Sequence, residues 1–379
     1  MHRLLRNLHN FSILTSEHGR SICRRLVAIW ITHRSRHWLF RQFPRLGLGA
    51  YDGSGLAALS GGNALHQPWD ALEAPRFTGP RTFARLPYLK DLTDVEAAVF
   101  GMPWDGSTSF RSGARFGPEA VRSMSAMLRT YNAVQKVQVF GELSTIDYGD
   151  APTVPGYVED TLERIEGFVR PIAEAGVVGI GIGGDHCATL AELRAYAKVH
   201  GPLGLVHLDS HTDLWHEYFG QPYAHGTMFR RAIEEGVLDP NRMIQAGMRG
   251  PLYGIEDEKI PDELGVQTIP WVDLAELSPT RFAEIARARV GTGPTFFTFD
   301  VDFVDAAFCP GTGTPEVAGP TSFEAMKFVR ALTDISFVGY DVVEVAPQYD
   351  SGQITALFAA NVAFEMLTLQ RMAVIQKSN

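Results

Sequence analysis

Cysteine is scarce in this chain of 379 residues, and the few cysteines form no pattern. The three of them, Cys23, Cys187 and Cys309, are far apart and include no C-x-x-C pair, which excludes a disulfide framework and a thiolate zinc site. A reducing compartment is therefore expected. The chain also lacks the run of about 18 to 20 consecutive apolar residues that a membrane-spanning helix requires. The longest candidate, residues 26–32, is far too short, so no membrane partner is expected.

Basic residues are scarce beyond the first 45 positions. Those positions hold nine Arg, no Lys and one acid, Glu17, whereas the remainder carries 25 basic and 42 acidic residues. A nucleic-acid surface would show clustered Lys and Arg. The acidic body therefore excludes nucleic acid as an expected partner and agrees with a protein that handles cations.

The Arg-rich opening has the composition of a targeting peptide, of a disordered polybasic arm, or of a segment read from a misassigned start. The Gly-rich stretch 46–62 is typical of a flexible linker. We therefore expect residues 1–62 to be an extension, disordered or targeting, and residues 63–379 to form the folded domain. The expected location is the cytoplasm, with the mitochondrion as the alternative if the extension is a presequence.

Short β-branched runs alternate with longer helical patterns, which is typical of βαβ units. We expect one three-layer α/β/α domain with a mainly parallel sheet of about eight strands. The candidate strands cover residues 97–101, 177–182, 203–208, 243–246, 266–269, 296–299 and 337–343. The candidate helices cover residues 158–173, 188–199, 226–235, 279–289, 323–332 and 355–372.

Ligand-type side chains follow three of the expected strands. In open α/β sheets, functional residues gather beyond the carboxyl ends of the strands. Alternation with period two turns the side chains of an extended segment to one side. The four carboxylates among these side chains would repel one another strongly unless cations bound between them, so we predict a two-metal site. The six residues are His186, Asp209, His211, Asp213, Asp300 and Asp302.

The expected ions are Mn²⁺, with Ni²⁺ or another divalent ion as alternatives, because carboxylates and imidazoles discriminate poorly among such ions. Two ions can generate a nucleophile from water at neutral pH, which makes hydrolysis the first reaction class to consider. A single His after a Gly-rich turn, or a single D-x-D, is more often structural. The combination of all six residues is what favours the metal site.

At these residues the sequence resembles the arginase, agmatinase and guanidinobutyrase superfamily of ureohydrolases. The matching segments are GGDH at 183–186, LDSHTD at 208–213 and TFDVDFVDAAFCPGTGTPEVAG at 298–319. Two further segments, 101–122 and 223–236, resemble the agmatinase branch. The resemblance implies an arginase-like fold and a homotrimer or homohexamer.

The resemblance also assigns roles. It implies that one Mn²⁺ is held by His186, Asp209, Asp213 and Asp300, and the other by Asp209, His211, Asp300 and Asp302. It implies that Glu344 receives the guanidinium group, that His225 shuttles a proton and that Asp213 stabilises the intermediate.

The expected reaction cleaves agmatine or a similar guanidino compound, a small cationic substrate, to urea and an amine. Trp215 is a candidate to cover the substrate at the mouth of the site. Guanidinobutyrate, guanidinopropionate and alkylated or free guanidine stay open as substrates. A carboxylate tail would need a cation such as Arg111 or Arg115. Formiminoglutamate-type or amide hydrolysis and a non-catalytic partner subunit are the remaining alternatives.

Overall fold

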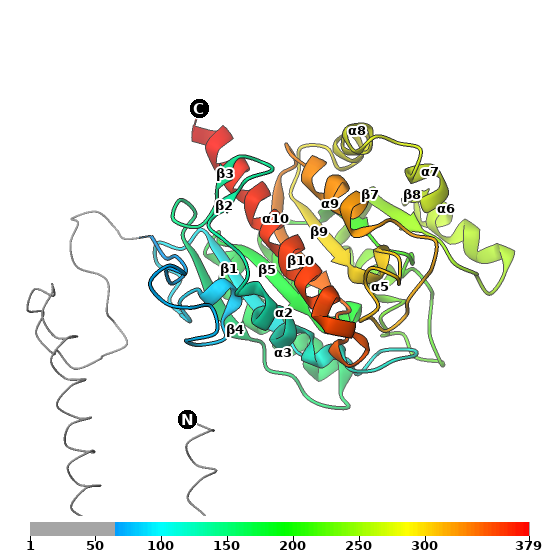
Figure 1. Ribbon diagram of the computed structural model, residues 1–379. Coiled ribbons are helices and arrows are strands. Elements are labelled where there is room, and N and C mark those ends of the chain that lie inside the picture. The colour runs from blue at the N-terminus through cyan, green and yellow to red at the C-terminus, as the bar shows by residue number, and fades with distance from the viewer. Residues whose placement is uncertain (1–64, 379) are drawn as a thin grey trace, which may run out of the picture. The chain divides into compact units, whose positions relative to one another are not determined.

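A sheet of eight strands forms the centre of the computed structural model, which describes residues 65–378 (Figure 1). The expected extension 1–62 lies outside the described residues. All neighbouring strands of the sheet pair in parallel, in the order β4-β1-β5-β10-β9-β6-β7-β8. The strands are β1 (Ala97–Met102), β4 (Thr145–Asp150), β5 (Val178–Gly183), β6 (Leu203–Leu208), β7 (Leu238–Met248), β8 (Gln267–Pro270), β9 (Thr295–Asp300) and β10 (Phe337–Val343). The expected α/β class with its mainly parallel sheet is confirmed.

Helices cover both faces of the sheet. One buried cluster joins the sheet to α2 (Gly117–Ser125), α8 (Pro279–Val290), α9 (Ser322–Ala331) and α10 (Ile354–Ser378). A second cluster joins the opposite face to α3 (Val158–Glu174), α4 (Thr189–His200) and α5 (Met228–Glu234). Within β1 the alternation is visible, because Val99 belongs to the first cluster and Phe100 to the second. Burial on both faces explains why these strands read as continuous apolar runs.

Four elements between residues 117 and 150 were missed from the sequence, among them a strand of the main sheet. The edge strand β4 has the sequence TIDYGD, whose two acids and glycine are depleted in strands. The structure compensates for the buried Asp147 with a salt bridge to Arg122 at 2.8 Å, from the equally unpredicted helix α2. A small antiparallel pair, β2 (Tyr131–Asn132) and β3 (Val137–Gln138), lies between them in the chain.

The remaining short helices, α6 (Ile260–Leu264) and α7 (Trp271–Leu274), flank β8. By length and hydropathy alone, residues Ser351–Lys377 would suffice to cross a membrane, with a mean hydropathy of 1.2. However, 72% of that apolar window is buried inside the fold, so α10 has the character of a core helix.

The strand order brings four carboxyl ends together. In the chain, β6 is the next strand after β5 and is joined to it through α4. In the sheet, β10 and β9 lie between these two strands. Such a position is where open α/β sheets form a crevice. Glycine is required here, since a Cβ on Gly184 would lie 2.0 Å from the backbone oxygen of Trp104. The segment after β5 can therefore pass close to the end of β1.

Candidate metal centre and active site

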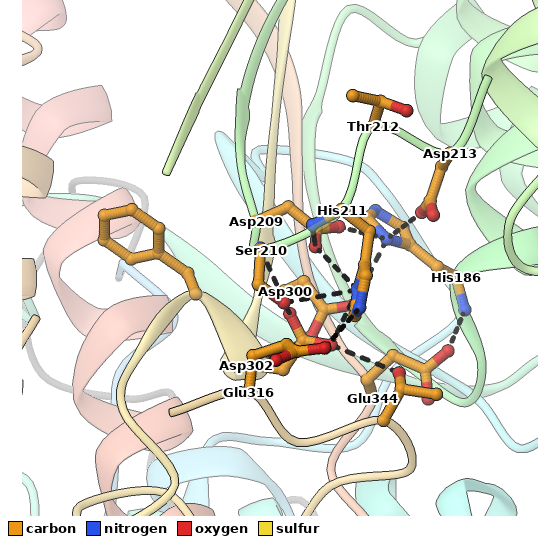
Figure 2. A network of polar contacts seen from close by, with 12 residues as sticks. His186, Asp209, Ser210, His211, Thr212, Asp213, Asp300, Asp302, Glu316 and Glu344 are labelled. Carbon is orange, nitrogen blue, oxygen red and sulfur yellow. Dashed lines mark hydrogen bonds and ion pairs between the residues drawn. The ribbon is translucent and has the colours of Figure 1, made fainter. Parts of the chain in front are cut away.

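All six residues expected to bind metal lie together at the ends of β5, β6 and β9 (Figure 2). His186 opens the turn after β5, and Asp300 ends β9 with Asp302 in the turn that follows. The segment after β6 supplies the remaining three, Asp209, His211 and Asp213. Five of the six are buried, and only His211 is partly exposed. The sheet therefore concentrates four carboxylates and two imidazoles in one small volume.

The imidazole of His186 faces three carboxylates. Its Nδ1 lies 3.1 Å from Oδ2 of Asp209, 3.1 Å from Oδ2 of Asp213 and 3.3 Å from Oδ2 of Asp300. Its Nε2 lies 2.8 Å from the hydroxyl of Thr298. Nδ1 is buried and makes no hydrogen bond within the described chain. An imidazole nitrogen surrounded by carboxylate oxygens has the chemistry of a metal-ligand set.

A second group of donors surrounds His211. Its Nδ1 lies 3.4 Å from Oδ1 of Asp209 and 3.2 Å from Oδ2 of Asp302. Asp209 therefore turns one oxygen to each histidine, as a carboxylate between two metal ions would. The hydroxyl of Ser210 donates to Oδ1 of Asp302 at 2.6 Å, which leaves Oδ2 for the centre of the cluster.

Turns, and not extended backbone, bring these side chains together. The prediction that period-two alternation in an extended segment aligns them is therefore wrong. Residues 209–213 lie beyond β6 in an irregular turn, and Asp302 lies in a 3₁₀ turn. In each turn the first carboxylate accepts the backbone N–H two residues later, from His211 to Asp209 at 2.6 Å and from Asp302 to Asp300 at 2.8 Å. These Asx turns fold the chain back, so the acids converge.

Burial and mutual repulsion shift the acidity of the cluster. Burial, followed by the charges of Asp302 and Asp209, raises the pKa of Asp300 well above its usual range. Burial also raises the pKa of Asp302. Asp209 goes the other way, since the neighbouring imidazoles, first of them His207, override the effect of burial and lower its pKa. Divalent cations would remove this repulsion, so the donor set fits a metal centre.

His207 is a site residue that the sequence analysis missed. It is fully buried on β6, and its Nε2 lies 2.7 Å from Oδ2 of Asp209. Its Nδ1 lies 3.0 Å from the amide nitrogen of Gln245, which also donates to the backbone oxygen of Thr212 at 2.7 Å. Because that amide nitrogen can only donate, Nδ1 of His207 accepts and Nε2 donates to Asp209. His207 therefore orients a carboxylate of the cluster and has no lone pair left for a metal ion.

Glu344 lies beside the cluster, directly after β10. Its Oε1 accepts the backbone N–H of His186 at 2.9 Å and lies 3.0 Å from Nδ1 of His225. Its Oε2 is buried and has no hydrogen-bond partner within the described chain. Glu344 also has φ of +66° and Asp213 has φ of +55°, conformations that side chains other than glycine rarely adopt. Strain of this kind gathers at functional sites.

The two arginines considered for binding a carboxylate tail differ in their partners. Arg111 stacks over Tyr349 at 4.8 Å and over Phe110 at 5.5 Å, and no carboxylate of residues 65–378 pairs with it. Arg115, in contrast, forms a salt bridge with Asp105, so its charge is already neutralised.

Trp215 belongs to an aromatic group with two tyrosines, in which Tyr253 is exposed while Trp215 and Tyr218 are half-buried. The group also lies close to the His225 segment. Its ring lies 5.5 Å from that of Tyr218 and 5.9 Å from that of Tyr253. A Cβ on Gly226, the residue after His225, would lie 3.2 Å from the Trp215 ring. The aromatic group therefore borders the expected mouth.

Comparisons with known proteins agree with this geometry. Residues 95–368 match the arginase family. A guanidinopropionase of Pseudomonas aeruginosa is 46% identical over 80% of this chain and 95% of its own length. A mitochondrial agmatinase of Gallus gallus is 40% identical over 77% of this chain and 86% of its own length.

A solved structure gives the same result at the level of the fold. Proclavaminate amidino hydrolase of Streptomyces clavuligerus superposes with a TM-score of 0.76 and 37% identity, over 79% of this chain and all of that one. The chain therefore belongs to the arginase family, in its agmatinase-like branch, and is a hydrolase of guanidino compounds.

Proposed function

We propose that this enzyme hydrolyses a short ω-guanidino compound to urea and a primary amine. The observation that carries the proposal is Oε2 of Glu344, a buried carboxylate oxygen that has no hydrogen-bond partner among residues 65–378, next to the His and Asp cluster. Leaving such an oxygen unpaired is costly, and a guanidinium with its planar fork of donors is the matching partner. The substrate would therefore complete a hydrogen-bonding set that the fold leaves open.

We further propose that the cluster holds two divalent cations, Mn²⁺ or alternatively Ni²⁺. His186, Asp209, Asp213 and Asp300 would hold one, and Asp209, His211, Asp300 and Asp302 the other. Two cations bound there supply a nucleophile at neutral pH and stabilise developing negative charge. The convergence of Nδ1 of His186 on three carboxylate oxygens supports this set.

The other residues would act on the substrate. Glu344 would orient the guanidinium through Oε2, while its Oε1 keeps His225 in place. The lack of a side chain at Gly313 favours this pose by keeping both oxygens accessible, because a Cβ there would crowd them, at 3.2 Å from Oε2 and 3.1 Å from the backbone oxygen of Arg111. That backbone oxygen would be a second acceptor for the guanidinium. Asp213 would accept from the nitrogen that becomes the urea amide, and His225 would supply a proton to the leaving amine.

A carboxylate tail is favoured over the cationic tail of agmatine by one observation. The guanidinium of Arg111 is held over Tyr349, and the described part of the chain gives it no acidic partner. The backbone oxygen of the same residue flanks Glu344. Guanidinopropionate and guanidinobutyrate would place their carboxylates there. The 46% identity to a guanidinopropionase supports this choice, while the 40% identity to an agmatinase keeps agmatine as the second candidate. The aromatic group at Trp215 would cover the tail.

We propose residues 63–379 as the catalytic domain, working in the cytoplasm as a homotrimer or homohexamer. A mitochondrial location stays the alternative, since the 40% identical relative from Gallus gallus is mitochondrial. Mapping the mature N-terminus in the cell would distinguish the two locations.

Urea release from a panel of substrates tests the activity. The enzyme would be loaded with Mn²⁺ and separately with Ni²⁺, then given guanidinopropionate, guanidinobutyrate, agmatine, arginine and guanidine. We expect the highest kcat/KM for a guanidino acid, and a loss of that preference over agmatine in Arg111→Ala. Higher kcat/KM for agmatine, unchanged in Arg111→Ala, would overturn the proposed tail. No urea from any compound, with both metals demonstrably bound, would overturn the proposed reaction.

A further inference from the structure

Both ring nitrogens of His225 are occupied, which limits how this histidine can deliver a proton. Nδ1 lies 3.0 Å from Oε1 of Glu344. Nε2 lies 2.9 Å from the backbone nitrogen of Ser109 and 2.7 Å from its hydroxyl oxygen. A backbone N–H can only donate, so Nε2 accepts in this state and Nδ1 carries the hydrogen that is directed to Glu344. Neither nitrogen has a free position toward a leaving amine.

We infer that the hydroxyl of Ser109 passes the proton from His225 to the leaving amine. The inference rests on the proposed function, in which His225 supplies that proton. When His225 is doubly protonated, Oγ of Ser109 is the one acceptor that residues 65–378 place beside Nε2–H, because the other neighbour is a donor.

The transfer conserves atoms and charge. The amine nitrogen takes the hydrogen of Oγ, and Oγ takes the hydrogen of Nε2 in the same step. The amine gains one proton, the imidazolium becomes neutral, and the serine is regenerated. In the product state Nδ1–H of His225 donates to Glu344, and the lone pair of Nε2 accepts from the Ser109 N–H. This is the arrangement in the structure.

The loop that carries Ser109 is fixed on both sides of it. The backbone N–H and hydroxyl of Ser107 donate to Oδ2 of the buried Asp185 at 2.9 and 2.8 Å. The backbone oxygen of Arg111 flanks the gap at Gly313, beside Oε2 of Glu344. Along the chain, Ser109 lies between the anchor at Ser107 and Arg111, whose backbone oxygen flanks the proposed guanidinium position.

The charges around His225 are balanced in a way that suits a proton carrier. Burial lowers its pKa, but the hydrogen bond to Glu344 and the charges of Glu344, Asp213 and Asp185 override burial and raise the pKa to about 9. The Ser109 N–H, aimed at Nε2, opposes the proton at that atom. The contact with Glu344 therefore stabilises the doubly protonated ring, and the Ser109 N–H stabilises the neutral ring.

A cavity of about 410 Å³ lies beside the relay residues, because Thr108 and Ala224, the chain neighbours of Ser109 and His225, line it. None of the six cluster residues is among its lining residues. Solvent would return a proton to the histidine through this cavity.

Ser109→Ala and Ser109→Thr test the relay, with Thr108→Ala as the matched control. Thr108 has a hydroxyl in the same loop that donates to the backbone oxygen of Asp105 at 3.2 Å and makes no contact with His225. We expect kcat to fall about 10- to 100-fold in Ser109→Ala, less than the full loss of a general acid, because Nε2–H can then partly donate to the amine directly. KM and bound metal should stay unchanged. Ser109→Thr should recover most of the activity, and Thr108→Ala should match the wild type.

A proton inventory in mixtures of H₂O and D₂O separates a relay from a purely structural role. We expect a curved dependence of kcat on the D₂O fraction in the wild type, from two protons in motion, and a straight line in Ser109→Ala. His225→Asn separates the relay through Ser109 from the role of His225 as the proton donor. Low kcat in His225→Asn with wild-type kcat in Ser109→Ala would overturn the relay alone. Wild-type kcat in His225→Asn would overturn the proposed role of His225, and the relay with it.

Discussion

Gly313→Ala should damage substrate binding without damaging the fold. The added Cβ would lie 3.2 Å from Oε2 of Glu344 and 3.1 Å from the backbone oxygen of Arg111. A charge-assisted N–H donor must come to about 2.8 Å from a carboxylate oxygen. The methyl group would therefore occupy space that the guanidinium needs in order to reach Glu344.

The size of the effect follows from the hydrogen bond that is lost. A hydrogen bond to a charged group contributes about 1.5 to 3 kcal/mol. Since each 1.36 kcal/mol corresponds to a factor of ten, kcat/KM should fall about 10- to 150-fold. Gly313 does not have a positive φ, so alanine meets no backbone strain, and the melting temperature should fall only slightly, from the close contact of its Cβ with the backbone oxygen of Arg111.

Steady-state urea release measures kcat/KM, and scanning fluorimetry measures stability. Gly167→Ala is the control, since that glycine lies in α3 with no atom within 4 Å of an added Cβ. The control should keep wild-type kcat/KM and gain about 0.5 to 1 kcal/mol in unfolding free energy, as alanine favours a helix. Wild-type kcat/KM in Gly313→Ala would show that the guanidinium does not bind at this gap, and the reasoning would fail.

Three further predictions concern the groups around the cluster. His207→Phe removes the donor to Asp209, so we expect Mn²⁺ affinity by titration calorimetry to fall about 10- to 100-fold; unchanged affinity would exclude that role. Chelation with EDTA should lower the melting temperature, because repulsion among the buried acids, Asp300 included, returns; an unchanged value would contradict a metal centre. Against the lowering effect of burial, the hydrogen bond to Glu344 and the charges of Glu344, Asp213 and Asp185 raise the pKa of His225 from 6.5 to about 9, so the stabilisation from its protonation is complete below pH 6.5 and lost above pH 9. His225→Asn should therefore lose less unfolding free energy at pH 10 than at pH 6 in urea denaturation, and an equal loss at both would refute the linkage.

The parallel sheet was predictable because burial on both faces leaves a simple mark in the sequence. The run Leu203–Leu208 is apolar apart from one histidine and ends at a cluster of polar residues, which indicates a buried strand followed by a functional turn. The edge strand β4 carries no such mark. Its acid Asp147 is tolerated only because Arg122 comes from a helix 25 residues earlier, and no local pattern encodes that pairing.

In the site, too, local patterns were predictable, whereas contacts between distant residues were not. Asp209, His211 and Asp213 were predictable as a group because their spacing is local, although the turn geometry that joins them was not. His207 was missed because a histidine inside an apolar strand looks like a core residue. Its role depends on Gln245 of β7, which reaches it only through the pairing of β6 with β7. A polar residue at the same register of two paired strands is a signal that could have identified it.

Backbone strain connects the fold to the chemistry at Glu344. A non-glycine residue at φ of +66° costs about 1 to 3 kcal/mol, and glycine would avoid that cost. The surroundings hold the residue in this conformation, because its N–H donates to the backbone oxygen of Gly184 at 2.9 Å and its Oε1 meets His186 and His225. Those contacts use the backbone and one carboxylate oxygen, and none of them uses Oε2. The fold therefore stabilises a strained residue in a way that leaves one oxygen free, which is what a guanidinium receptor requires.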